Sequence, residues 1–156
     1  MSFPRILEGE IAARGRKVAI AAARFNDFIV SSLLKGATAA WLEKGGAEQD
    51  LLVARVPGAF ELPVVARKMA LSGHYDAIVA LGCVIRGDTP HFDYVAGECA
   101  RGLQLASLET GIPIVFGVLT VENVEQALER AATTGANKGG ESMTTALEMA
   151  SLMRQL

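Results

Sequence analysis

Apolar residues in this chain are gathered in four short runs that alternate with longer stretches of mixed composition. The runs cover residues 17–23, 50–56, 77–85 and 112–119. They are continuous rather than alternating, which predicts β-strands buried on both faces of a sheet. The longer stretches, residues 28–43, 62–71, 94–109, 124–133 and 142–155, predict helices. Glycines at 45–46, 73 and 111 stand where the first three helices should end.

This alternation predicts one α/β domain that spans residues 1–156. Strands joined by helical crossovers run parallel, so we expect an open parallel sheet of four strands with helices on both faces, a three-layer arrangement. Residues 1–14 precede the first strand as an N-terminal arm, and residues 5–11 within it have the pattern of an extra edge strand. The neighbouring sequence offers this strand no partner.

Composition narrows the classes of protein to consider. Hydrophobic residues make up 51% of the sequence and charged residues 21%, a balance too apolar for a disordered chain. The longest stretch without a charged residue, 110–121, is shorter than the ~20 residues of a membrane helix, so we expect no membrane span. Lysines and arginines, 15 in all, balance 17 aspartates and glutamates without a basic stripe, which disfavours nucleic acid as a partner.

The cysteines and the high apolar content predict the location of the protein and its contact with other subunits. Cys83 and Cys99 form no CxxC pair, so a reducing cytoplasm is the expected location. No histidine, cysteine and carboxylate cluster has the spacing of metal ligands, and we expect no metal. The apolar content is high for a lone domain, which favours contact between subunits.

Residues suited to chemistry follow the carboxyl end of each predicted strand. The four segments are residues 24–26, 56–61, 86–91 and 120–123. The carboxyl ends of parallel strands meet at one edge of the sheet, where open α/β folds bind ligands. Ordinary turn residues occupy the opposite ends, so we expect the functional site at the carboxyl edge.

His91 is the strongest single candidate for a chemical role at this edge. An imidazole can both give and take a proton near neutral pH. By position alone, His91 is equally well interpreted as an exposed histidine or a cap of the following helix. The other histidine, His74, follows Gly73 at a helix end and is interpreted as a capping residue.

Gly87, Asp88 and Thr89 stand just before the same helix. Free backbone N–H groups and the helix dipole at such a terminus suit an anion such as phosphate, and the Thr89 hydroxyl adds a donor. For this turn taken alone, simple capping by Asp88 or Thr89 is the favoured interpretation. Neither a GxxxxGK[ST] nor a GxGxxG loop is present to indicate a nucleotide.

The remaining candidates are aromatic or charged: Phe25, Phe60, Glu61, Phe116, Arg130 and Lys138. Each aromatic ring could stack on a planar heterocycle or fill the core. Glu61 stands at a predicted helix start, where a carboxylate is favourable for structural reasons. Arg130 lies off the apolar stripe of its helix and Lys138 lies in a predicted glycine-rich turn, so both are surface charges by position alone.

Taken together, the strand ends resemble those of one enzyme family. The matching segments are ARFN at 23–26, VPGAFELP at 56–63, ALGCVIRGDTPHFDYV at 80–95, FGVLTVEN at 116–123, QALERA at 126–131 and NKG at 137–139. Their order is similar to that in the lumazine synthases (6,7-dimethyl-8-ribityllumazine synthases) of riboflavin biosynthesis. The resemblance covers nearly the whole chain and implies a flavodoxin-like fold. Its most specific part is VPGAFELP together with IRGDTPHFDYV.

The resemblance implies a transferase that condenses 5-amino-6-(D-ribitylamino)uracil with 3,4-dihydroxy-2-butanone 4-phosphate and uses no cofactor. It implies that His91 carries protons and that Phe25 stacks on the uracil-derived ring. The other residues that it implies for the first substrate are Ala59, Phe60, Glu61 and the backbone of Cys83, Val84 and Ile85. Those that it implies for the second substrate are Asp88 and Thr89 at the phosphate, Phe116 and Arg130 from a neighbouring subunit, and Lys138 nearby.

Assembly is also implied by the resemblance. Members of the family form pentamers, and some pack twelve pentamers into an icosahedral, sixty-subunit shell. Residues 5–11 would then add a strand to a neighbouring subunit's sheet, and riboflavin synthase is a further expected partner. Shell-forming members often carry a GTKAGN-like stretch where residues 132–137 read ATTGAN, so pentamer and shell both stay open.

Two other functions are weighed against this one. A flavin carrier could use the same sheet, but no Ser/Thr-rich phosphate loop follows the first strand, where Arg24 to Asp27 stand. A non-catalytic shell or interaction protein would keep the architecture and lack turnover. The full set of site residues weighs against this second alternative.

Overall fold

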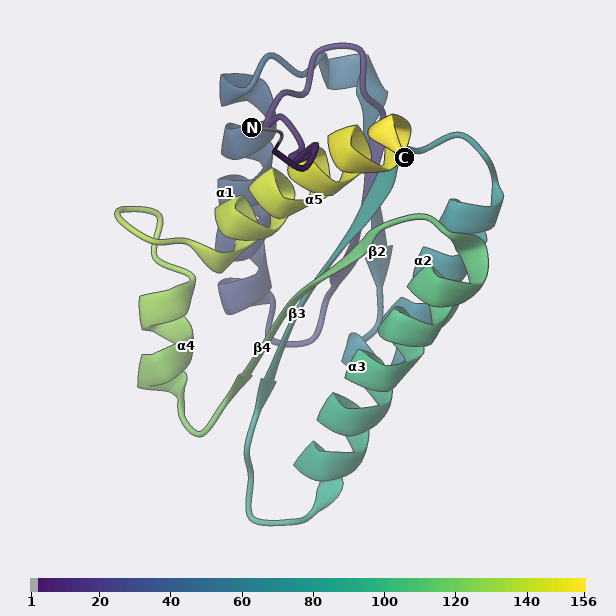
Figure 1. Ribbon diagram of the computed structural model, residues 1–156. Coiled ribbons are helices and arrows are strands. Elements are labelled where there is room, and N and C mark those ends of the chain that lie inside the picture. Colours follow the sequence, from purple (N-terminus) through teal and green to yellow (C-terminus); the bar gives the residue numbers. More distant parts are fainter. Residues whose placement is uncertain (1–2) are drawn as a thin grey trace.

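Four parallel strands form a sheet between two layers of helices, as the alternation of apolar runs predicts (Figure 1). The computed structural model describes residues 3–156, so residues 1 and 2 of the predicted arm lie outside the described part. The strands are β1 (Val18–Ala23), β2 (Leu51–Val56), β3 (Ala77–Ile85) and β4 (Ile114–Val121), in the spatial order β2-β1-β3-β4. The helices are α1 (Asp27–Glu43), α2 (Leu62–Leu71), α3 (His91–Thr110), α4 (Val124–Arg130) and α5 (Lys138–Gln155).

Alternate residues of the central strands face two separate hydrophobic cores. In β1, Val18, Ile20 and Ala22 pack with residues of α1 and α5. The residues between them, Ala19 and Ala21, pack with residues of α2 and α3 on the other face. Both central strands, β1 and β3, are therefore buried on both faces, which confirms the interpretation of their continuous apolar runs.

The same prediction is wrong for β2. Leu52 is 45% exposed and Val53 is 39% exposed, although both belong to a continuous apolar run. The cause is position: β2 is an edge strand that pairs with β1 alone, while the helices pack chiefly over β1, β3 and β4. Apolar side chains on both faces of an unpaired edge are typical of a strand that another chain covers.

The predicted carboxyl ends of the first three helices are confirmed to within one residue, although α3 begins at His91 rather than at residue 94. The predicted end of α4 and the predicted start of α5 are wrong. Left-handed glycines at 45, 73 and 111 follow the first three helices. Helix α4 ends at Arg130 rather than at residue 133, and α5 begins at Lys138 rather than at residue 142. Lys138 thus opens a helix instead of lying in a turn. The glycines at 139 and 140 concealed this start, and a Cβ at Gly139 would overlap the backbone oxygen of Leu33 on α1.

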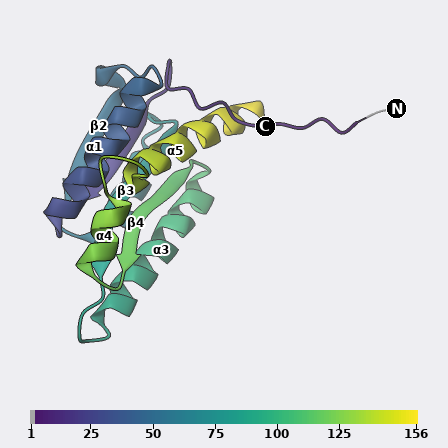
Figure 2. The same ribbon diagram turned by 90° about the vertical axis from the view of Figure 1, so that its left-hand side faces the viewer.

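The described part of the N-terminal arm, residues 3–14, is anchored against the last turns of α5 and contains no strand. The backbone N–H of Glu10 donates to Ser151 Oγ at 2.9 Å, and Gln155 Nε2 donates to the carbonyl of Glu8 at 2.9 Å. Beyond this anchor the chain runs away from the body of the molecule (Figure 2), with Phe3 and Ile6 exposed. None of the described helices combines the length and the apolar character needed to cross a membrane.

Candidate active site

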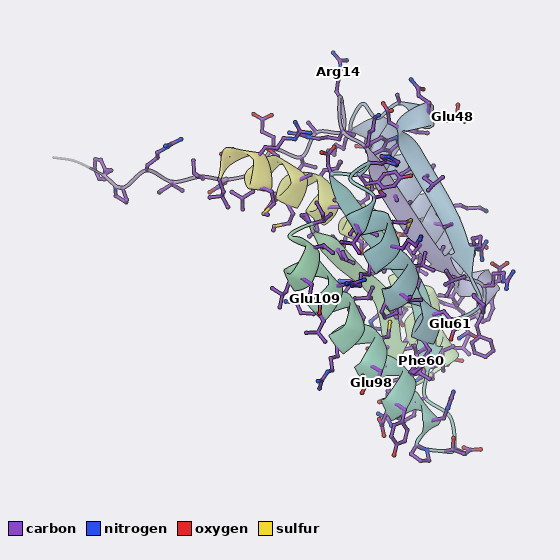
Figure 3. The ribbon with its side chains drawn as sticks, turned by 90° about the vertical axis from the view of Figure 1, so that its right-hand side faces the viewer. Arg14, Glu48, Phe60, Glu61, Glu98 and Glu109 are labelled. Atoms are coloured by element: carbon purple, nitrogen blue, oxygen red, sulfur yellow. The ribbon has the colours of Figure 1, made fainter. Side chains whose placement is uncertain are left out.

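A cleft of about 740 Å³ opens at the carboxyl edge of the central strands. Figure 3 shows Phe60 and Glu61, two of its residues, at the end of the molecule opposite Arg14 and Glu48. The lining residues are Phe25, residues 57–61, residues 83–85, Gly87, Thr89, His91, Phe92, Tyr94 and Val95. Three of the four predicted strand ends therefore meet in one cavity, as expected of an open parallel sheet.

Phe25 forms one wall of the cleft from the turn between β1 and α1. Its ring is 71% exposed, so it is not a core residue in this chain. The backbone N–H of Phe25 donates to the carbonyl of Pro57 at 3.0 Å. Next to it, Asn26 adopts a left-handed conformation (φ 61°) and its Nδ2 donates to the carbonyl of Cys83 at 2.9 Å. The turn is thus fixed at both ends while the ring faces open space.

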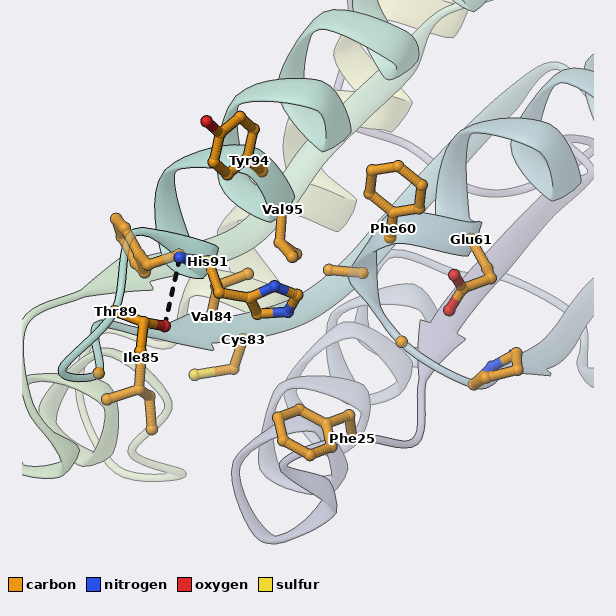
Figure 4. A pocket seen from close by; sticks show the side chains of 15 residues that line it. Phe25, Phe60, Glu61, Cys83, Val84, Ile85, Thr89, His91, Tyr94 and Val95 are labelled. Atoms are coloured by element: carbon orange, nitrogen blue, oxygen red, sulfur yellow. Dashed lines mark hydrogen bonds between the residues drawn. The ribbon is translucent and has the colours of Figure 1, made fainter.

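Residues 57–61 form the adjoining wall between β2 and α2. A single 3₁₀ turn, Ala59–Glu61, carries the chain into α2, and the N–H of Glu61 donates to the carbonyl of Gly58 at 3.2 Å. Glu61 holds the position before α2, as the helix-start interpretation predicts, but its side chain makes no capping bond. Its carboxylate points into the cleft instead (Figure 4).

The end of β3 forms the floor, with Cys83, Val84 and Ile85. Burial raises the pKa of the Cys83 thiol to about 11. The thiol is therefore neutral at physiological pH and is a poor nucleophile, because the thiolate is the reactive form. The Cys83 carbonyl accepts from Asn26, so Asn26 joins the turn of Phe25 to the floor of the cleft, a role that the sequence motifs did not indicate.

His91 is the first residue of α3, and its imidazole projects into the cleft across from Glu61 and Phe25 (Figure 4). Pro90 occupies the cap position, where no side-chain capping bond is formed. The backbone N–H of His91 makes a long hydrogen bond of 3.4 Å to Thr89 Oγ1. Neither His91 nor Asp88 caps α3, so the capping interpretation is wrong for these two residues, whereas the Thr89 hydroxyl accepts the N–H of the first helical residue. His91 is exposed, as its other interpretation predicts. Asp88 is exposed and lies outside the set of lining residues.

Phe116, Arg130 and Lys138 lie together in a second hollow of about 570 Å³, beside β4. It shares no lining residue with the cleft. Arg130 is exposed and its Nη1 donates to the carbonyl of Gln126 at 3.0 Å, which confirms its predicted surface position. Glu141, in the first turn of α5, also lines this hollow and was not singled out from the sequence.

Two features of the sequence could have identified the residues that the sequence analysis missed. Phe92, Tyr94 and Val95 line the cleft because they occupy the first turns of α3, and their positions follow once the helix start is known. Asn26 could have been found from its place between a strand and a helix, since asparagine adopts the left-handed region more readily than most residues. Within residues 3–156, no group of three or more histidine, cysteine or carboxylate side chains could hold a metal ion.

These features define an α/β enzyme of the open-sheet class. An imidazole, a carboxylate and an exposed aromatic ring share one cleft, and two cationic side chains occupy a separate hollow.

Comparisons with known proteins agree with this class and make it specific. Residues 15–154 match the model of the 6,7-dimethyl-8-ribityllumazine synthase family. A protein of that name from Syntrophus aciditrophicus is 53% identical over 99% of this chain and 100% of its own length. Relatives of the same name from Chlorobium chlorochromatii and Chlorobium phaeovibrioides are 53% and 52% identical, each over 96% of this chain and 97% of their own length.

The chain belongs to the 6,7-dimethyl-8-ribityllumazine synthase family. Membership makes it an enzyme with lumazine synthase activity, which confirms the function that the sequence motifs implied. The flavin-carrier alternative loses its support, because the similarity extends over nearly the full chain.

Proposed function

We propose that the protein condenses 5-amino-6-(D-ribitylamino)uracil with 3,4-dihydroxy-2-butanone 4-phosphate in the cleft, in the step of riboflavin biosynthesis that yields 6,7-dimethyl-8-ribityllumazine. The observation that carries the proposal is the shared cleft of Phe25, Glu61, Thr89 and His91. These residues supply a stacking face, a hydroxyl acceptor, an anion-binding donor and a proton carrier.

The uracil derivative is proposed to lie on the Phe25 side. A flat aromatic ring held out of the core suits a planar heterocycle. Ala59, Phe60 and the carboxylate of Glu61 then accommodate the ribityl chain, whose hydroxyl groups donate to Glu61. The backbone of residues 83–85 faces the edge of the pyrimidine. The Cys83 carbonyl already accepts from Asn26, so the other groups of this segment carry most of the recognition.

His91 is proposed to carry the protons of the reaction. The amine of the first substrate adds to the ketone of the second and loses water to give an imine. Elimination of phosphate then leaves an enol, which takes up a proton at carbon and becomes a ketone. The second nitrogen adds to this carbonyl, and loss of a second water closes the ring. Each step moves a proton, and one imidazole in the cleft can serve several of them. Holding both substrates in register supplies much of the remaining acceleration.

The phosphate is proposed to lie at the turn before α3. Free N–H groups at the helix start and the Thr89 hydroxyl donate to it. Because Asp88 is exposed and absent from the cleft lining, its carboxylate need not approach the anion. Within residues 3–156 of one chain no lysine or arginine lines the cleft, and Arg130 and Lys138 line a separate cavity. We therefore propose that Arg130, with Phe116 and Lys138, completes the cleft of a neighbouring subunit.

The pentamer that the family resemblance implies is part of this proposal, and an unpaired strand edge and the arm support contact between subunits. The unpaired edge of β2 exposes Leu52 and Val53, and the part of the arm before its anchor at Glu8 extends from the body with Phe3 and Ile6 uncovered (Figure 2). An arm strand from a neighbour would cover such an edge. Packing of pentamers into a sixty-subunit shell, and binding of riboflavin synthase, are further steps of this proposal. The cytoplasm is the proposed location, supported by two free, buried cysteines.

The proposal is tested by mixing the purified protein with both substrates and recording the appearance of the fluorescent lumazine. Turnover supports it. Large assemblies without turnover would identify a non-catalytic shell protein, and a yellow protein without turnover would identify a flavin carrier. Light scattering of the full chain and of a variant lacking residues 1–14 then tests assembly: the pentamer should weaken when the arm is removed.

A further inference from the structure

Arg86 makes an unusual set of contacts for an exposed side chain. Its Nε lies 2.8 Å from Glu122 Oε2, and its Nη1 lies 3.3 Å from Asp93 Oδ1. The centre of its guanidinium group lies 4.3 Å from the centre of the Phe92 ring. Its backbone N–H donates to the carbonyl of Val121 at 2.9 Å. One side chain therefore joins three segments: the end of β3, the first turn of α3 and the residue after β4.

These contacts bracket the turn proposed to bind phosphate. Arg86 precedes residues 87–90, and two of its partners, Phe92 and Asp93, follow His91 directly. Inside the turn the backbone is held by the N–H of Asp93 on the Pro90 carbonyl at 3.0 Å and by the long bond from His91 to Thr89. The guanidinium group thus spans the turn and fixes the position at which α3, and with it His91, begins.

The ion pair between Arg86 and Glu122 connects Arg86 to α4, the helix that carries Arg130. Glu122 N–H donates to Gln126 Oε1 at 2.8 Å, and the carbonyl of Gln126 accepts from Arg130 Nη1 at 3.0 Å. The ion pair with Glu122 therefore braces the start of α4 against the end of β3. The same guanidinium group supports one residue of the cleft and one of the second hollow.

We infer that Arg86 is a positioning residue for the reaction: it holds the turn of residues 87–90 and His91 in the geometry that binds the phosphate-bearing substrate. The inference rests on the proposed function. Exposed ion pairs contribute little to folding stability, so placement rather than stability is the consequence of this network. A planar fork that pairs with two carboxylates and stacks on a ring is specific to arginine, and lysine offers only a point charge.

The experiment compares Arg86→Met and Arg86→Lys with the wild-type protein in steady-state kinetics, varying each substrate in turn. Displacement of positioned groups by about 1 Å can cost up to ~100-fold, so we expect Arg86→Met to lower kcat about tenfold and to raise the KM of the phosphate-bearing substrate about tenfold. The KM of the uracil derivative should stay within about twofold, since Phe25 and Glu61 are on other walls. Arg86→Lys should recover part of the loss.

The matched control is Arg67→Met, which removes the exposed pair between Arg67 Nε and Glu109 Oε2 (3.2 Å) at the far end of α3. It should leave both KM values and kcat unchanged. Circular dichroism shows whether Arg86→Met folds. If it does not, Glu122→Gln is used to test the inference, because it breaks one contact and keeps the guanidinium group. Glu122→Gln should show a weaker form of the same split between the two KM values.

The inference would be overturned if Arg86→Met showed wild-type kinetics. If Arg86→Met does not fold, wild-type kinetics in Glu122→Gln would overturn it. An equal change of both KM values would also overturn it, since a merely structural role predicts no split. Failure of the proposed function is distinguishable, because the wild-type protein and His91→Ala are measured alongside. An active wild type, an impaired His91→Ala and an unaffected Arg86→Met refute only the positioning role.

Discussion

The cleft at the end of β3 and the hollow beside β4 differ in what they contain. The cleft, about 740 Å³, combines aromatic and aliphatic walls with one imidazole and one carboxylate. The hollow, about 570 Å³, has Arg130 and Lys138 beside Phe116, together with the carboxylates of Glu129 and Glu141. The described residues that line the cleft supply the stacking face, the imidazole and the Thr89 hydroxyl but no lysine or arginine, and both cationic side chains lie in the hollow.

This division has a structural origin. The cleft forms where β1 and β3 end between α1, α2 and α3, so its residues come from segments that the sheet brings together. The hollow lies on the outer side of the sheet, where β4 is an edge strand. A condensation that expels phosphate needs the functions of both cavities. This division supports our proposal that a complete site uses two copies of the chain, with the hollow of one facing the cleft of the other.

The largest expected effect comes from His91→Ala, which removes the proton carrier from the cleft. General acid–base catalysis contributes ~10²–10⁴-fold, and kcat should fall by about this factor while both substrates still bind. Single-turnover kinetics and a binding titration with the uracil derivative measure the two properties separately. Unchanged turnover would remove His91 from the mechanism.

Arg130→Ala should act on the other cavity and on the other substrate. A hydrogen bond to a charged group is worth ~1.5–3 kcal/mol, so the KM of the phosphate-bearing substrate should rise by roughly 10- to 100-fold. The KM of the uracil derivative should not change. Arg67→Ala, on the exposed surface of α2, serves as the control for loss of a positive charge. If the KM of the phosphate-bearing substrate were equal in Arg130→Ala and the control, Arg130 would be a surface charge without a role in binding.

Phe25→Ala should affect the uracil derivative and not the phosphate-bearing substrate, and its effect should be smaller than that of Arg130→Ala. Aromatic stacking contributes ~0.5–1.5 kcal/mol beyond the buried area, which predicts an increase of roughly 2- to 10-fold in the KM of the uracil derivative. Because the ring is exposed, the free energy of unfolding should hardly change. Urea denaturation checks stability, and a shift confined to the phosphate-bearing substrate would contradict the proposed stacking.

The smallest expected effect concerns Cys83 at the floor of the cleft. Burial raises its pKa from 9.0 to about 11, so the thiol ionises more readily in the unfolded chain. Stability is then fully present below pH 9.0 and decreases as the pH rises towards 11. Cys83→Ala should flatten this decrease in thermal unfolding and leave the pH profile of turnover between about 6 and 8 unchanged. Identical unfolding curves in both proteins would contradict the shift.

Much of the fold follows from the sequence because the central strands are buried on both faces. The continuous apolar runs located β1 and β3, and glycines marked the ends of α1, α2 and α3. The exposed edge of β2 could not be predicted, because an apolar run does not say whether a helix or another subunit covers it. The start of α5 was missed because two glycines weaken the helical signal, and here Gly139 serves the close approach to α1.

The candidate site was predictable in part for a similar reason. Parallel strands place their carboxyl ends together, so three of the four segments meet in the cleft. The fourth segment does not, and the placement of Phe116, Arg130 and Lys138 in a separate hollow depends on tertiary structure. The left-handed conformation of Asn26 could be predicted from its place between a strand and a helix. Its contact with Cys83, and that of Arg86 with Glu122, join residues distant in sequence, and no local pattern identifies such contacts.

The measurement that tests the shared site most directly is complementation between His91→Ala and Arg130→Ala. The two variants are unfolded together in equal amounts and refolded so that their subunits mix. The phosphate-bearing substrate is kept well below its KM for Arg130→Ala, so that each variant is weakly active alone. If the site joins the cleft of one chain to the hollow of its neighbour, about a quarter of the mixed sites regain both residues, and activity should recover to about that fraction of wild type. Activity that stays at the average of the two separate variants would show that each chain builds its own site and would contradict the account.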